Sequence, residues 1–144
     1  MVTEVVVDSS VIIALVIPEE HSDWALKKIS EHTFLHILDF SYYEVANAIK
    51  CKASTELTAK GAEKAFTKAL EIMNLFGVHS FGEVIVDAMA LALKYNIAVY
   101  DASFLSLADN LDIRLLTLEV KLAQKFENTK YRGLIEYPNK QSTH

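Results

Sequence analysis

The sequence predicts a three-layer α/β/α fold in which a central parallel sheet of four to five strands lies between two layers of helices. Short apolar runs alternate with helical segments across short connections, which is the pattern of βαβ units. Hydrophobic residues make up 51% of the 144-residue chain, while Gly (4) and Pro (2) are scarce. This composition indicates a compact, ordered and helix-rich protein.

The predicted strands are short apolar runs that end at polar or turn-forming positions. They are residues 5–7, 33–38, 97–100 and 113–117, with a short edge strand within 130–137. Two of them lead directly into a carboxylate, because Asp8 follows the first and Asp101 follows the third. Strands buried on both faces of a parallel sheet have this uninterrupted apolar character.

The predicted helices lie between these strands and begin or end at capping residues. They span residues 9–16, 22–29, 41–53, 59–76, 84–95, 102–111 and 119–126. Ser9 or Ser10 is expected to cap the first helix, and Thr58 the fourth. Gly77 and Asn96 are the expected stops of the fourth and fifth helices.

One domain is expected over residues 1–138, followed by a flexible polar tail, residues 139–144. No apolar stretch is long enough to span a bilayer, and a single cysteine, Cys51, excludes an internal disulfide. A reducing cytoplasm is therefore the expected location. The net charge of −5 argues against a nucleic-acid partner without excluding one, because cations bound at an acidic site offset that charge locally.

Four carboxylates are placed where strands end or helices begin: Asp8, Glu44, Asp101 and Glu119. Because the carboxyl ends of neighbouring parallel strands meet at one edge of a sheet, these side chains are expected to share a crevice. Like charges in a crevice raise one another's pKa unless a cation joins them. Oxygen ligands of this kind suit Mg²⁺ or Mn²⁺. The hydroxyls of Ser9 and Thr117 are expected within reach of the same site.

Each acid also has a purely structural explanation. Asp8 and Asp101 can cap the helices that follow them. Glu44 and Glu119 can be first-turn acids favoured by the helix dipole. The convergence of all four on one edge favours a functional site.

The residues that hold a substrate are not evident from the sequence. Lys60, Lys64 and Lys68 recur on one face of a predicted helix, and Lys121 and Lys125 flank the Glu119 segment. These lysines are candidate phosphate contacts. The more ordinary explanation is that they solvate exposed helix faces.

The segments around the acids form an ordered pattern. Asp8 lies in VVVDSSVIIAL, Glu44 in SYYEVANAI and Asp101 in AVYDASFLSLA, which RLLTLEVKLA follows. This pattern resembles a PIN domain, and most closely the VapC-type toxins of prokaryotic toxin–antitoxin systems. The likeness extends from about residue 4 to residue 127.

The resemblance implies an endoribonuclease that depends on Mg²⁺ or Mn²⁺, with Asp8, Glu44 and Asp101 as carboxylate ligands. The family's fourth acid is usually an aspartate two residues after Ser or Thr. In this chain the segment T117-L118-E119 puts Glu119 there, and its extra methylene would bind a metal from farther back or through water. The resemblance also implies a homodimer that a small antitoxin protein holds inactive.

Two alternatives stay open at this point. One is a catalytically degenerate PIN domain that serves as an RNA-binding or scaffold module, which the departure at Glu119 allows. The other is a metal-dependent phosphatase or DNA nuclease on a similar scaffold. The segment DSSV lacks the second aspartate of the haloacid dehalogenase pattern, which argues against that class of phosphatase.

Overall fold

The computed structural model describes residues 2–139, which contain a five-stranded sheet with the order β3-β2-β1-β4-β5. The strands are β1 (Glu4–Val7), β2 (Phe34–Leu38), β3 (Gly77–His79), β4 (Arg114–Leu116) and β5 (Ile135–Glu136). Every pairing between neighbours is parallel, which confirms the predicted sheet. The chain runs outward from β1 to β3 and then returns to the other side of β1. The carboxyl ends of β1 and β4 therefore border the point where the strand order reverses, which is where open α/β sheets bind ligands.

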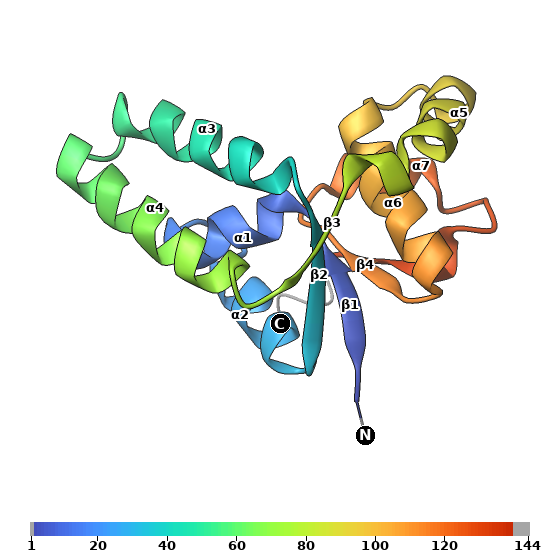
Figure 1. The fold of residues 1–144 in the computed structure, drawn as a ribbon, viewed down its shortest axis with the longest axis horizontal. Coiled ribbons are helices and arrows are strands. Elements are labelled where there is room, and N and C mark those ends of the chain that lie inside the picture. The colour runs from blue at the N-terminus through green and yellow to red at the C-terminus, as the bar shows by residue number, and fades with distance from the viewer. Residues whose placement is uncertain (1, 140–144) are drawn as a thin grey trace.

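Seven α-helices cover the two faces of the sheet (Figure 1). They are α1 (Ser9–Val16), α2 (Ser22–Ser30), α3 (Ser41–Ala53), α4 (Ala59–Met73), α5 (Ile85–Tyr95), α6 (Val99–Leu111) and α7 (Val120–Lys125). Helices α1 to α4 lie on one side and α5 to α7 on the other, as Figure 1 shows. Residues 2–139 also contain two 3-10 helices, η1 (Phe81–Glu83) and η2 (Arg132–Leu134). The predicted three-layer architecture is thus confirmed.

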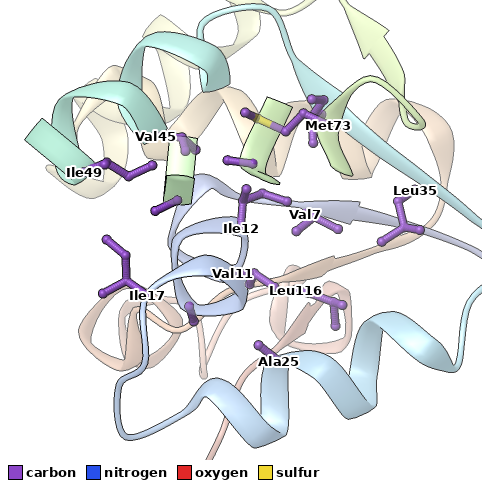
Figure 2. Packing of buried hydrophobic residues seen from close by; sticks show 14 of the residues in the cluster. Val7, Val11, Ile12, Ile17, Ala25, Leu35, Val45, Ile49, Met73 and Leu116 are labelled. Carbon is purple, nitrogen blue, oxygen red and sulfur yellow. The ribbon is translucent and has the colours of Figure 1, made fainter. Parts of the chain in front are cut away.

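The valine run of β1 is buried on both faces of the sheet. Val5 and Val7 pack into the cluster formed with α1 to α4, whereas Val6 packs into the cluster formed with α6 and α7. Figure 2 shows Ile12 of α1 near Val7 in the first of these clusters. Because successive side chains of a strand point to opposite faces, only an all-apolar strand satisfies both layers.

A strand predicted over residues 97–100 is wrong, because α6 begins at Val99. Asp101 consequently lies in the first turn of a helix and not at the end of a strand. A short apolar run does not by itself distinguish a strand from a buried helix. The helical outcome follows from burial, since seven consecutive residues of α6, 102–108, are buried against neighbouring elements.

The strand that the sequence prediction missed is β3, in the segment where Gly77 was expected to close a helix. Helix α4 ends earlier, at Met73. A Cβ atom at residue 77 would come within 2.8 Å of the Phe34 ring on β2. Glycine therefore permits this close pairing of β3 with β2.

Two predicted helix boundaries are confirmed. The Thr58 side chain caps α4 by accepting a hydrogen bond of 3.0 Å from the Gly61 N–H. Asn96 ends α5 in the left-handed conformation with φ of 54°. Asparagine tolerates that conformation better than most other residues.

Within residues 2–139 no helix has the length and apolar character needed to cross a membrane. The organisation of residues 1–138 as one domain stays a prediction. Beyond Asn139, the predicted flexible tail lies outside the described residues.

Candidate active site

The four predicted acids come from four different segments that meet at one end of the sheet. Asp8 directly follows β1. Thr117 directly follows β4, and Glu119 lies two residues after Thr117. Glu44 and Asp101 lie in the first turns of α3 and α6. The fold thus brings together residues that are far apart along the chain, as the sequence predicts.

Asp8 is nearly inaccessible to solvent, with 4% of its surface exposed. Its Oδ1 accepts a hydrogen bond of 3.0 Å from the Ser10 N–H and another from the Ser10 hydroxyl. Asp8, and not Ser9 or Ser10, is therefore the N-cap of α1. Burial raises the pKa of Asp8 to about 6, although hydrogen bonds from Ser10 and Thr117 oppose the rise.

Glu44 is held by a neighbouring hydroxyl at the start of α1. The Ser9 Oγ–H donates a hydrogen bond of 2.7 Å to Glu44 Oε1. Burial raises the pKa of Glu44, the Ser9 hydrogen bond lowers it, and the charge of Asp101 raises it again. The predicted proximity of Ser9 to the acids is thus present in the fold.

Asp101 and Glu119 lie close enough for their carboxyl groups to share a hydrogen bond. Burial raises the pKa of Asp101, while the bond with Glu119 lowers it. Burial also raises the pKa of Glu119 to about 8, and the charges of the other three carboxylates push it in the same direction. The Glu119 carboxyl group therefore keeps its proton to a higher pH than an ordinary glutamate.

Two hydroxyl residues at the base of the crevice hold these acids in place. Thr117, which is fully buried, accepts a hydrogen bond of 3.0 Å from the Glu119 N–H and also bonds to Asp8. The sequence suggested Ser10 only as a cap. Its hydroxyl accepts a hydrogen bond of 3.0 Å from the Leu118 N–H and donates another to Asp8. Ser10 thus ties β1 to the segment after β4. The second serine of the segment DSS was its only signal in the sequence.

The arrangement of the crevice fits a hard divalent cation. Among residues 2–139, no three His, Cys, Asp or Glu side chains already stand as a set of metal ligands. The carboxyl groups are instead engaged by Ser9 and Ser10 or by each other. Burial raises the pKa of all four carboxyl groups, which disfavours their ionised forms, and every atom they offer to a metal is an oxygen. A divalent ion suits both features, because its charge stabilises ionised carboxylates and it prefers oxygen ligands.

A cleft of about 570 Å³ opens beside two of the acids. Asp101 and Glu119 line it together with Lys121 and Lys125. The Lys125 ammonium group also donates a hydrogen bond of 2.7 Å to the Asn96 carbonyl, and this bond fixes its position beside the cleft. The cleft therefore offers carboxylates and ammonium groups side by side.

The other candidate cations occupy a different surface. Lys60, Lys64 and Lys68 line a shallow groove on α4 together with Glu63 and Glu71. The two glutamates offset much of the positive charge of that groove. Its lining has no residue in common with the cleft beside Asp101 and Glu119.

Two exposed tyrosines each precede an acid of the crevice in the sequence. Tyr43 precedes Glu44 and is 82% exposed, and Tyr100 precedes Asp101 and is 59% exposed. The Tyr100 ring packs edge-on against Phe40 with centroids 5.4 Å apart, so the starts of α3 and α6 are adjacent. Exposed aromatic rings in such positions are able to stack on bases.

Known proteins are similar to this chain in sequence and in fold. The family model of the PIN domain matches residues 5–125. Ribonuclease VapC3 of Pyrobaculum aerophilum is 42% identical over 124 residues, covering 85% of this chain and 95% of that protein.

Solved structures give the same result. The crystal structure of PAE2754 from Pyrobaculum aerophilum has a TM-score of 0.62 at 26% identity, covering 95% of this chain and 90% of that one. A toxin–antitoxin complex from Klebsiella pneumoniae has a TM-score of 0.69 at 16% identity, covering 94% of this chain and 98% of that one, which shows the shared fold. The chain therefore belongs to the PIN domain family and is of the VapC type.

Proposed function

We propose that the protein is a divalent-metal-dependent endoribonuclease and the toxin component of a VapBC-type toxin–antitoxin system. The observation that carries this proposal is the crevice in which burial raises the pKa of Asp8, Glu44, Asp101 and Glu119, and the charge of Asp101 raises the pKa of the other three further. Support comes from the 42% identity to Ribonuclease VapC3 and from the fold shared with a toxin–antitoxin complex. The cytoplasm is the proposed location.

Mg²⁺ or Mn²⁺ is the proposed cofactor, held by Asp8 and Asp101, with Glu44 and Glu119 as further ligands. When bound, such an ion lowers the pKa of a coordinated water and neutralises charge on the phosphate. The hydroxyls that bond Asp8 and Glu44 orient these carboxylates, as outer contacts do in metal sites generally. Thr117 and Ser9 are thus supporting residues.

The residues around the crevice have separate roles in holding RNA. Lys121 and Lys125 attract backbone phosphates toward the cleft that Asp101 and Glu119 line. Tyr43 and Tyr100 offer exposed rings for stacking on unpaired bases, a contact that does not depend on base identity. Together these groups favour a single-stranded substrate.

A cleavage assay tests the proposal directly. Purified protein should cut single-stranded RNA when Mn²⁺ or Mg²⁺ is present and should stop when EDTA is added. Equal cutting of DNA of the same sequence would favour a general nuclease. RNA binding without cutting at any metal concentration would favour the degenerate module and would contradict the proposal.

Glu119 provides a prediction specific to this chain. Glu119→Gln removes a negative charge at unchanged length, so metal affinity should fall by about tenfold. Glu119→Asp keeps the charge and shortens the side chain to the family's usual residue, so it should retain metal binding and cleavage. Metal titrations of both variants separate the two effects. If Glu119→Gln matches the unmodified protein in both affinity and rate, Glu119 is only a helix-start acid.

A homodimer and an antitoxin are the proposed protein partners. Helix α5 carries an apolar outer face on which Val86, Met89 and Leu93 are 79%, 49% and 73% exposed. Such a face on one helix is typical of a protein–protein contact. We assign it to the homodimer.

Leu93→Glu should shift the protein toward the monomer, because it puts a charge on that apolar face. Light scattering after size-exclusion chromatography measures the change in mass. Leu75→Glu is the matched control, since Leu75 is 79% exposed but lies after α4. A dimer that survives in Leu93→Glu would move the interface away from α5.

A further inference from the structure

A chain of four polar side chains crosses three neighbouring strands outside the carboxylate crevice. His36 Nε2 lies 2.8 Å from Glu4 Oε1, and His36 Nδ1 lies 2.9 Å from His79 Nε2. His79 Nδ1 lies 3.3 Å from Glu83 Oε1. The order Glu4, His36, His79, Glu83 thus puts two imidazoles between two carboxylates.

Gly77 makes this arrangement possible. It pairs with His36 in the β2–β3 register, and a Cβ atom there would lie 3.3 Å from His36 Nδ1. Without a side chain at this position, the His79 ring reaches back along the strand to His36. The space between the two facing nitrogens is therefore kept open by the backbone.

The outer contacts determine which ring nitrogens carry hydrogen. An ionised carboxylate only accepts hydrogen bonds, so His36 Nε2 and His79 Nδ1 must be the donors to Glu4 and Glu83. The His79 bond also lowers the pKa of Glu83, which favours that carboxylate. His36 Nδ1 and His79 Nε2 consequently both present lone pairs to each other at 2.9 Å. Two facing lone pairs need a positive centre between them.

We propose that the facing nitrogens of His36 and His79 form a binding site for a borderline transition-metal cation, with Zn²⁺ as its type. Imidazole nitrogen suits this class of ion, and an imidazole whose other nitrogen donates to a carboxylate is typical of its ligands. Zn–N bonds of about 2.0–2.1 Å put two ligand nitrogens roughly 3.3 Å apart, so the pair opens by a few tenths of an ångström. The pair shares no residue with the carboxylate crevice.

The surroundings of the pair permit this small movement. The His79 side chain is 19% exposed and lies on β3, a three-residue edge strand, whereas His36 is 11% exposed on β2. Asp39 is the other carboxylate of this region, and it accepts hydrogen bonds from the N–H groups of Phe40 and Phe81. Within residues 2–139 no third side chain completes the ligand set, so water supplies the remaining positions. A proton shared by the two rings is the competitor for the site.

Zn²⁺ titration of the full chain carrying Asp8→Asn and Asp101→Asn tests the proposal, because those changes weaken the crevice as a competing metal site. One equivalent of Zn²⁺ should bind at pH 7.5. In this double variant, a further His79→Gln change should weaken Zn²⁺ binding more than tenfold. A further Glu83→Gln change should weaken it by about tenfold. A further His21→Gln change in the same variant, at the N-cap of α2, should leave the Zn²⁺ affinity unchanged.

Ring-nitrogen NMR gives an independent readout that needs no histidine variant. At saturating Zn²⁺ the signals of His36 Nδ1 and His79 Nε2 should shift more than those of the other histidines. Equal Zn²⁺ affinity in the His79→Gln and His21→Gln proteins, or unchanged signals from both paired rings, would overturn the proposal. The pair would then be a hydrogen-bonded contact between strands and nothing more.

Discussion

Asp101→Asn should lower the rate of RNA cleavage in saturating Mn²⁺ by about a thousandfold, equivalent to about 4 kcal/mol of transition-state stabilisation. The same change should make the metal-free protein more stable, because it removes the Asp101 charge that disfavours ionisation of Asp8, Glu44 and Glu119. Asparagine keeps the size of the side chain, and its amide donates to Glu119. The melting temperature should rise by roughly 3 °C for each kcal/mol gained. Parallel cleavage assays and thermal unfolding in EDTA measure both effects.

Asp109→Asn is the matched control for this experiment. Asp109 lies on the same helix, α6, but it is exposed and lines a different cleft. It should change neither cleavage nor stability appreciably. Full activity of the Asp101→Asn protein would remove Asp101 from the reaction. Reduced activity together with reduced stability would point to a structural role for this aspartate.

The metal-free protein should lose stability as pH rises from about 4 to about 8. A carboxyl group whose pKa is higher in the folded than in the unfolded protein binds more protons when folded. Its stabilising effect is therefore complete at low pH and disappears as pH rises through the folded pKa. Burial raises the pKa of Asp8 from 3.8 to about 6, and the pKa of Glu119 reaches about 8. For the buried Asp8 alone, the loss is about 3 kcal/mol.

Unfolding by urea at several pH values, in EDTA, measures this dependence. Comparison with Asp8→Asn isolates the contribution of Asp8 from those of other titrating groups, and the variant should show a flatter curve. The Glu119 residue as a whole is more accessible to solvent than Asp8, although its carboxyl group is partly enclosed by the crevice, so screening should make its contribution smaller. Mn²⁺ should restore the stability at pH 8, by about 2.7 kcal/mol at a hundredfold excess over its dissociation constant. If the unmodified protein and the Asp8→Asn variant have the same pH profile, the charge of Asp8 does not destabilise the protein.

The two explanations of Asp8 that the sequence leaves open turn out to be compatible. The same carboxyl group caps α1 through Ser10 and lies within the electrostatic reach of Asp101. A residue that follows a strand and precedes a helix is local to both elements, so sequence analysis identifies it well. Its neighbours across the crevice come from other segments and are not visible in a local pattern.

Asp101 shows how a correct residue can be assigned to the wrong element. The run before it is apolar and short, so its periodicity is compatible with a strand. Burial of α6 on nearly all sides is a property of the packed protein, and it turns the same residues into a helix. The carboxylate still reaches the crevice, because the first turn of α6 lies at the same edge of the sheet as the end of β1.

By itself the sequence determined the α/β class, the parallel sheet and the four acids that gather at its edge. These features follow from apolar periodicity, capping residues and the common direction of parallel strands, all of which are local or topological. Only the tertiary structure decided that β3 pairs with β2 across Gly77, that Asp101 and Glu119 line one cleft, and that the outer face of α5 is exposed. Each of these features depends on distances between segments that are far apart in the chain. Close packing of the folded protein specifies these distances, and the local sequence pattern does not.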